Sequence, residues 1–265
     1  MTSRHFDIAI IGSGIAGGAL AVALKDSGLS VLLLDRRTGP LDTARGDHIQ
    51  PAMQSVLSRW GVLDRLMEAG AEQRAGTRWF DAEGAHIVTV PVPQRDDCAG
   101  AFLFLNHEKI GDILLATAEE AGFVNITGVS DWSLTRVTEY WRVDWQANNQ
   151  STSATCILLV AADGTASTVR SRLEIGPDRH RYQYLIAVLY GRQQGVSHER
   201  TLDVYLAEQR MVSLIPRLSE NHAVGLQMGT ITGGGFVALK KQLQLAAGDE
   251  RVLDGMALKA AGLMV

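Results

Sequence analysis

A glycine-rich segment near the N-terminus limits what this chain can fold into more than any other feature. Residues 8–11 form a continuous apolar run, typical of a strand buried on both faces, and Gly12, Gly14 and Gly17 follow it at G-x-G-x-x-G spacing. The small residues and leucines that come next predict a helix packed closely on a sheet, and residues 31–34 predict a second strand. The segment is therefore predicted to form a βαβ unit of a parallel sheet.

Each residue type in this segment has a physical task in binding a dinucleotide. Gly12 permits a tight turn, Gly14 lets the backbone approach a pyrophosphate, and Gly17 lets the helix lie close to the strand. The N-terminus of the helix offers N–H groups and the positive end of its dipole to phosphates. Asp35 follows the second strand, near the offset at which a carboxylate accepts hydrogen bonds from a ribose. The pattern predicts an ADP-binding site and leaves both FAD and NAD(P) open.

Composition and charge narrow the class of partner. The chain has 265 residues, of which 46% are hydrophobic, and a formal net charge of −4 without basic blocks, which disfavours nucleic acid and anionic membranes as partners. Cys98 and Cys156 form no C-x-x-C pair, which favours a reducing cytoplasm over a disulfide framework or a metal site. There is no run of ~18 apolar residues that predicts a membrane span. We therefore expect a cytoplasmic protein with a small-molecule partner; the oligomeric state stays open.

A second strong signal is a strand followed by an Asp-Gly pair. Residues 157–161 form another continuous apolar run, which predicts a buried strand. Asp163 and Gly164 lie at its C-terminal end, where α/β sheets place ligand-binding groups. An ordinary Asp-Gly turn is the alternative interpretation.

Arg45 begins a loop in which its guanidinium either pairs with a phosphate or is simply solvated.

Several other segments predict regular elements. The predicted elements are two short helices within 53–67 separated at Gly61, a hairpin of 77–80 with 86–90, strand 101–105, helix 108–121, strands 124–129, 133–138 and 141–146, strands 184–190, 201–206, 210–216 and 223–230, and helices 236–247 and 251–263.

These elements predict a discontinuous domain organisation. Four strands without intervening helices after residue 177 indicate an antiparallel sheet and hence a second subdomain that covers the cofactor's reactive end. We assign a dinucleotide-binding domain to residues 1–75 and 100–178, a substrate subdomain to residues 76–99 and 179–240, and C-terminal helices to residues 241–265.

Three motifs together resemble the FAD-dependent aromatic hydroxylases typified by p-hydroxybenzoate hydroxylase. They are GSGIAG with Asp35, ARGDHIQP, and AADGTASTVR, in family order and at family-like spacing over nearly the whole chain. The resemblance implies an α/β fold: a Rossmann-like FAD-binding domain with a βαβ unit, a parallel sheet and a β-meander, and a second antiparallel-sheet substrate subdomain. It also implies a monooxygenase in which NAD(P)H reduces FAD, O₂ adds to give a flavin hydroperoxide, and oxygen passes to an aromatic or polyketide-like small molecule.

The resemblance implies roles for individual residues. Asp35, followed by Arg36, would bind the adenosine ribose, and the backbone of Val129 would reach the adenine. Arg45 would bind the phosphate or ribityl region, and Asp163 with Gly164 the ribityl chain and pyrophosphate. His107 occupies a slot where arginine is frequent; it either contacts FAD or is an ordinary side chain at a helix N-terminus. The pyrophosphate would be bound by Gly12, Ser13, Gly14, Ile15, Ala16 and Gly17.

Candidate substrate residues lie on the predicted second subdomain and in the Arg45 loop. Each has a plainer interpretation as a core or sheet-surface residue, and the sequence identifies no catalytic residue. The candidates are His48, Tyr190, Tyr205, Met211, His222, Gln227 and Met228.

One departure from the family pattern keeps other functions open. The family carries a third fingerprint, a Gly-Asp pair followed by Ala, His and Pro, and nothing like it occurs in these residues. The chain is thus interpreted as a fragment or a shortened relative, and a non-catalytic FAD-binding protein is the main alternative. A flavin-dependent halogenase is a weaker one, because residues 211–216 read MVSLIP rather than a G-W-x-W-x-I-P segment.

Overall fold

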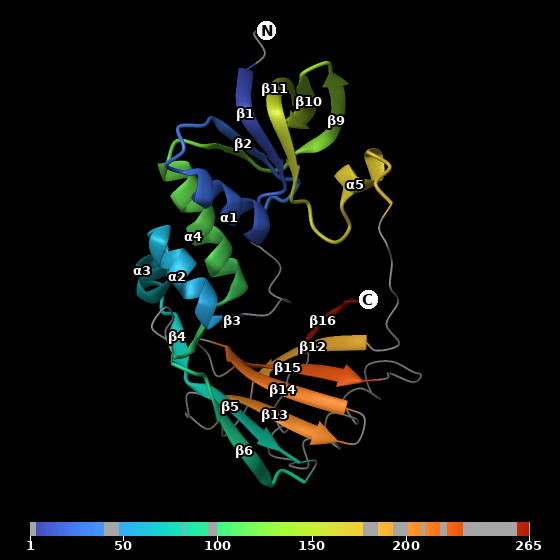
Figure 1. Ribbon diagram of the computed structural model, residues 1–265. Coiled ribbons are helices and arrows are strands. Elements are labelled where there is room, and N and C mark those ends of the chain that lie inside the picture. Colours follow the sequence, from blue (N-terminus) through green and yellow to red (C-terminus); the bar gives the residue numbers. More distant parts are fainter. Residues whose placement is uncertain are drawn as a thin grey trace. The chain divides into compact units, whose positions relative to one another are not determined.

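The computed structural model divides the chain into two compact units. One contains residues 1–41 and 108–179, and the other contains residues 42–107 and 180–265 (Figure 1). The predicted roles of the two parts, FAD binding and substrate binding, stay predictions. The structure describes residues 4–39, 48–81, 83–94, 100–176, 185–192, 201–207, 210–217, 222–229 and 259–264.

The first unit is built on a six-stranded sheet with the order β8-β2-β1-β11-β10-β9. Strands β8, β2, β1 and β11 run parallel to their neighbours, while β11, β10 and β9 form an antiparallel meander. The predicted parallel sheet with a β-meander is therefore confirmed. The bounds are β1 Arg4–Ile11, β2 Val31–Leu34, β8 Val124–Ile126, β9 Ser130–Val137, β10 Tyr140–Ala147 and β11 Gln150–Ala161.

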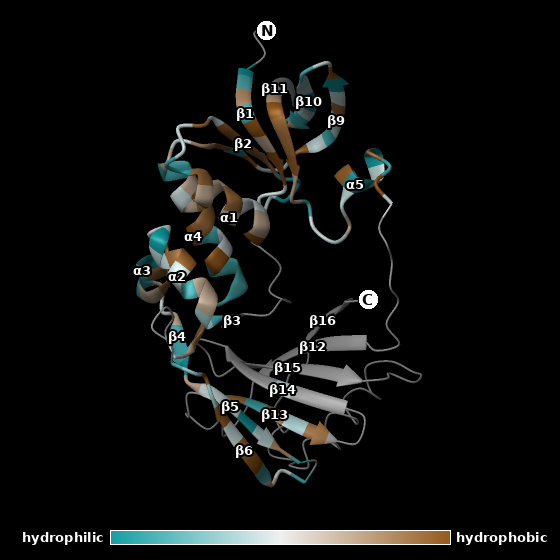
Figure 2. Cartoon of the chain, in the orientation of Figure 1, coloured by the Kyte–Doolittle hydropathy of each residue, from teal (hydrophilic) through white to brown (hydrophobic). Residues whose placement is uncertain are grey.

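Both faces of the central strands are buried, as their continuous apolar runs predict. Ile8 and Ile10 point to one face, where they join Ala21 of helix α1 (Ile15–Leu24) and Ala118 of helix α4 (His107–Glu120) in one apolar cluster. Ala9 and Ile11 alternate to the other face and pack in a cluster with residues of the meander. Figure 2 shows hydrophobic residues, in brown, along much of β1, β2 and α1.

The edge of β11 departs from the prediction of a buried strand. β10 pairs with β11 only as far as Cys156, whereas β1 continues to Ala161. Within the described ranges, the residues of β11 after Cys156 therefore pair with β1 alone. Ile157 and Leu158 are 57% and 52% exposed. The strand is correctly predicted, but its complete burial is wrong at these two side chains.

The second unit begins with two short helices, α2 (Pro51–Arg59) and α3 (Leu63–Glu68). The break predicted at Gly61 is confirmed, with a φ of 69° there. A three-stranded sheet of order β3-β7-β4 accompanies them, comprising β3 His48–Ile49, β7 Phe102–Phe104 and β4 Glu72–Arg74.

A seven-stranded sheet of order β16-β12-β15-β14-β13-β5-β6 forms the rest of the second unit. Its pairs are antiparallel except β5 with β13, where the guanidinium of Arg78 donates to both carboxylate oxygens of Asp203 at 2.8 and 2.6 Å. The hairpin and the four later strands are confirmed. The bounds are β5 Gly76–Phe80, β6 His86–Pro91, β12 Leu185–Arg192, β13 Thr201–Ala207, β14 Arg210–Arg217, β15 His222–Gly229 and β16 Lys259–Met264.

The structure describes part of only one of the two predicted C-terminal helices. The helix predicted at 236–247 lies outside the described residues. The helix predicted at 251–263 is wrong over residues 259–263, which belong to β16 (Lys259–Met264), a strand that pairs antiparallel with β12. A short apolar run fits either element by its pattern alone, and here the ladder with β12 provides backbone partners.

Candidate functional site

The turn between β1 and α1 requires glycine at its first position. Gly12 has a φ of 101°, and a Cβ there would lie 2.4 Å from the carbonyl oxygen of Ala162. The same Cβ would lie 2.8 Å from Cα of Asp163. The glycine turn and the Asp163-Gly164 motif, far apart in sequence, thus meet at one edge of the sheet.

Gly17 sets how closely α1 approaches β1. A Cβ at Gly17 would lie 1.9 Å from the carbonyl oxygen of Gly12 and 3.3 Å from Cγ2 of Ile10. Gly18 is similarly close to α4, since its Cβ would lie 3.2 Å from that of Leu114. The structure therefore gives Gly12 and Gly17 the turn and the close packing that the sequence predicts.

The N-terminus of α1 is suited to an anion. Gly14 is the N-cap residue, and neither a side-chain cap nor an acidic residue in the first turn occupies the helix's N–H groups. Gly14 and Ile15 are half-buried and Ala16 is exposed, so the first turn is partly open. Unpaired N–H groups and the positive end of the helix dipole make such a terminus favourable for phosphate.

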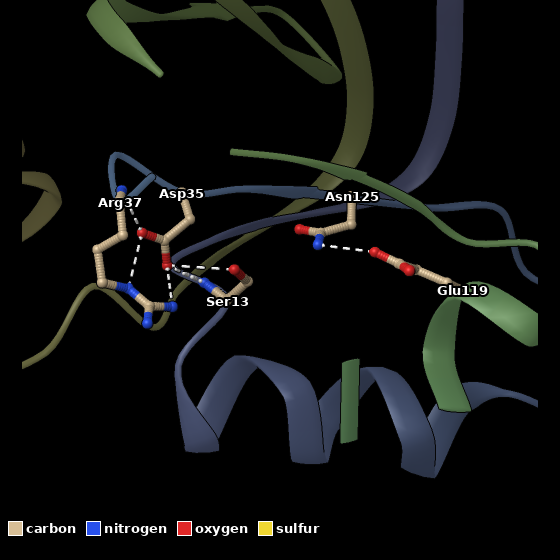
Figure 3. Close-up of polar contacts among 5 residues, drawn as sticks. All are labelled: Ser13, Asp35, Arg37, Glu119 and Asn125. Carbon is tan, nitrogen blue, oxygen red and sulfur yellow. Dashed lines mark hydrogen bonds and ion pairs between the residues drawn. The ribbon is translucent and has the colours of Figure 1, made fainter. Parts of the chain in front are cut away.

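Asp35 lies beside this turn, and two residues surround its carboxylate (Figure 3). Its Oδ2 accepts hydrogen bonds from N–H of Ser13 at 2.7 Å, from Oγ of Ser13 at 3.2 Å and from Nη2 of Arg37 at 2.9 Å. Its Oδ1 accepts from N–H of Arg37 at 2.8 Å and from Nε of Arg37 at 3.1 Å. Ser13 is fully buried and Asp35 is 6% exposed, so these bonds form away from bulk water.

The electrostatics at Asp35 favour the ionised form. Burial alone would raise the pKa of the Asp35 carboxyl. The hydrogen bonds from the side chain and backbone of Arg37 and from the backbone of Ser13, with the charge of Arg37, outweigh burial and hold that pKa below its ordinary value. The site therefore contains a buried carboxylate that stays an acceptor at neutral pH.

Backbone hydrogen bonds tie the Asp35 loop to the segment that follows β8. N–H of Asp35 donates to the carbonyl of Ile126, and N–H of Val129 donates to the carbonyl of Asp35, both at 2.9 Å. N–H of Gly128 donates to the carbonyl of Arg37 at 2.9 Å. Within β8, Nδ2 of Asn125 donates to Oε1 of Glu119 in α4 at 3.0 Å (Figure 3). Val129, predicted at the adenine, is thus brought next to Asp35.

The side chain of Asp163 holds the start of helix α5 (Thr168–Arg172). Its Oδ1 accepts from Oγ of Ser167 at 2.5 Å, and its Oδ2 accepts from N–H of Thr168 at 2.6 Å and of Val169 at 3.0 Å. Gly164 has a φ of 85°. The motif is therefore a turn that fixes a helix beside the glycine turn, and its contact with a cofactor stays a prediction.

Sequence reasoning missed two residues of this arrangement. Arg37 was not singled out, although a basic residue two positions after a strand-terminal acid is a usable signal for an ion pair. Ser167 was also missed; its Oγ caps α5 by accepting from N–H of Arg170 at 3.0 Å. A serine directly before the first helical residue is the pattern that predicts such a cap.

The remaining candidates are not brought into this cluster by any described contact. Arg45 lies outside the described residues. Arg36 is exposed and His107 begins α4. The structure describes only the backbone of five of the substrate candidates, in three strands: Tyr190 in β12, Met211 in β14, and His222, Gln227 and Met228 in β15.

Two substrate candidates with described side chains lie in the second unit. His48 stacks on Phe104 with ring centroids 5.5 Å apart and meets Phe102 edge-on at 5.8 Å. Burial lowers the pKa of His48, so the ring is neutral at physiological pH. Tyr205 stacks on Phe80 at 4.9 Å. Aromatic surroundings of this kind suit either a core position or an aromatic ligand.

Comparison with known proteins agrees with this geometry. The family described as FAD binding domain matches residues 5–230. The chain is 28% identical over 176 residues to 3-amino-4-hydroxybenzoate 2-monooxygenase of Streptomyces cremeus, covering 64% of this chain and 42% of that one. It is 29% identical over 180 residues to 6-methylpretetramide 4-monooxygenase of Streptomyces rimosus, covering 66% of this chain and 42% of that one.

A solved structure shows the same fold. The flavin-dependent monooxygenase PieE, in complex with FAD and substrate, superposes with a TM-score of 0.80 at 17% identity, over 100% of this chain and 50% of that one. The chain thus spans less than half of the two enzymes above and half of this one. No helix in the part that the structure describes is long and apolar enough to cross a membrane. From its matched residues and its glycine turn, the chain belongs to the FAD binding domain family.

Proposed function

We propose that this chain is the FAD-binding part of a monooxygenase that hydroxylates an aromatic or polyketide-like small molecule with NAD(P)H and O₂. One observation carries the proposal: the uncapped N-terminus of α1 opens beside the buried carboxylate of Asp35. The two curated relatives, named for aminohydroxybenzoate and pretetramide oxygenation, support the substrate class. A cytoplasmic location belongs to the same proposal.

The residues present fit FAD in both shape and charge. The first-turn N–H groups of α1 would bind the pyrophosphate, since Gly12 and Gly17 leave no side chain in the turn. Asp35 would accept hydrogen bonds from the ribose, and the backbone at Val129 would lie near the adenine. Asp163 would act indirectly, by fixing the turn at Gly164 and the start of α5. Bound FAD would supply the redox chemistry that activates O₂ for transfer to an electron-rich ring.

Flavin binding is the first test. FAD titrated into the 265-residue chain is expected to show a shifted absorbance spectrum and quenched fluorescence. Asp35→Ala should weaken the affinity by about 1–3 kcal/mol, because a buried polar partner of the ribose is lost. Asp7→Ala is the matched control: its carboxylate accepts from N–H and Oγ of Ser30, both at 2.7 Å, at the opposite end of β2.

The outcomes separate the candidate functions. An unchanged affinity in Asp35→Ala would remove Asp35 from the site, and no spectral shift in the unaltered chain would refute FAD binding by it. Oxidation of NAD(P)H that depends on an added phenol or anthracycline-type ring is the expected result for a monooxygenase. Tight flavin binding without any such oxidation would favour the non-catalytic FAD-binding alternative.

A further inference from the structure

The carboxylate of Asp35 has no acceptor position left for a ligand. Its two oxygens accept five hydrogen bonds, three on Oδ2 and two on Oδ1. A carboxylate has about four lone-pair positions. A ribose that binds here needs at least one of them for a hydroxyl group, so a donor now in place must leave.

The donors differ in how freely they can leave. N–H of Ser13 belongs to a fully buried residue between β1 and α1. N–H of Arg37 belongs to a loop held by the bond from N–H of Gly128 to the carbonyl of Arg37. The side chain of Arg37 is different, because it is 30% exposed and ends a flexible stem. Oγ of Ser13 can also rotate away, but its loss leaves four hydrogen bonds on about four acceptor positions and frees none. Turning Nε and Nη2 of Arg37 to water leaves three hydrogen bonds and frees a position without moving the backbone.

We propose that the Arg37 guanidinium is a displaceable stand-in for the ribose of the bound nucleotide, and this inference rests on the proposed FAD function. Binding exchanges two guanidinium hydrogen bonds at Asp35 for hydroxyl hydrogen bonds. Before binding, the ion pair gives the buried carboxylate its counter-charge and two of its five hydrogen bonds. Arg37 is therefore a positioning residue that lowers nucleotide affinity and requires ribose hydroxyl groups to displace it.

The exchange predicts a specific pattern with two probes. ADP carries the two ribose hydroxyl groups, and 2′,3′-dideoxy-ADP lacks them. Arg37→Ala should bind ADP about three- to tenfold more tightly, because no bidentate ion pair has to be broken. Its affinity for dideoxy-ADP should not rise, because that probe has no hydroxyl group for the vacated positions.

Arg36→Ala is the charge-matched comparison. It removes the same charge one residue away, and no described hydrogen bond joins Arg36 to Asp35. Its effect on ADP affinity measures what a cation in this loop contributes without a described hydrogen bond to Asp35. Arg37→Ala is expected to exceed Arg36→Ala in ADP affinity and to equal it in dideoxy-ADP affinity. Equal effects of the two variants on ADP, or a gain at Arg37 for both probes alike, would overturn the proposal.

A spectroscopic measurement does not depend on a variant that folds. The Nε–H resonance of Arg37 should be protected from exchange in the free chain and lose that protection on saturation with ADP. A protected signal in the saturated chain would overturn the proposal, as would failure of both the unaltered chain and Arg37→Ala to bind ADP. If ADP removes the protection of Nε–H but added FAD gives no spectral shift, the FAD function is refuted and the displacement of Arg37 by the ribose stands.

Discussion

Most of the candidate site depends on the carboxylate of Asp35. It joins the glycine turn through Ser13 and its own loop through Arg37. The sequence predicts the acid from its distance to the glycines, yet it does not predict the ion pair, because an exposed lysine or arginine after a strand is common. The side chain that holds this turn together is therefore also the proposed acceptor for the ribose.

Acid should weaken the fold through Asp35. Because the pKa of Asp35 is lower in the folded chain than in the unfolded one, its stabilising contribution is present above the unfolded pKa, about 4, and is lost as the pH falls through the folded pKa. Asp35→Asn should lose on the order of 1–3 kcal/mol at pH 7 and flatten the pH dependence of urea unfolding between about pH 2 and 5. Asp26→Asn, at an 88% exposed side chain, is the control. A curve as steep in Asp35→Asn as in the unaltered chain would contradict the assignment.

His48 should act in a different pH range. Burial lowers its pKa in the folded chain, so the unfolded chain binds more protons below about pH 6.5. The contribution of neutral His48 is fully present above that pH and declines as the pH falls below it. His48→Phe is expected to reduce the loss of unfolding free energy between about pH 7 and 5, measured by denaturant titration. A variant whose stability still falls equally over this range would show that His48 is not responsible.

At the scale of elements, glycine at position 17 sets how closely α1 packs on β1. The Cβ of an alanine at position 17 would overlap the carbonyl oxygen of Gly12, a backbone atom that cannot rotate away as the end of a side chain can. Gly17→Ala should therefore cost about 1–3 kcal/mol and also weaken FAD binding. Gly39→Ala, with no neighbour within 4 Å of the added Cβ, should change the stability by less than about 0.5 kcal/mol. Equal stability of the two variants would disprove the close approach.

The open edge of β11 gives a second test at this scale. Ile157→Ala should change the free energy of unfolding by less than about 1 kcal/mol, because its side chain is 57% exposed. Ile10→Ala, the same substitution at a fully buried position on the adjacent strand, should cost about 2–5 kcal/mol. Chemical denaturation measures both. A loss at Ile157 as large as that at Ile10 would show that the edge is covered in solution.

At the scale of the molecule, the part of the predicted nucleotide site around Gly12, Asp35 and Asp163 lies within the first unit. Saturation with FAD at about 100 times its Kd should stabilise the folded state by about 2.7 kcal/mol. Hydrogen exchange should then slow first at the Asp35 loop and at the segment around Val129. Protection confined to β13 and β14, in the other unit, would contradict the placement of the site.

What the sequence determines by itself is local. The βαβ unit, the turn at Gly12, the close packing at Gly17 and the later strands follow from apolar patterns and from the steric freedom of glycine, which depend on near neighbours in the chain. The FAD family follows as well, because its motifs are short and contiguous.

The tertiary structure alone decides which partners meet across the chain. It places the Asp35 carboxylate against Ser13, brings Asp163 beside Gly12, leaves Ile157 exposed at the edge of β11, and makes Lys259–Met264 a strand instead of a helix. In each case the physical reason is the same. A carboxylate, a strand edge or a short apolar run can be satisfied in more than one way, and its neighbours in space determine which one forms.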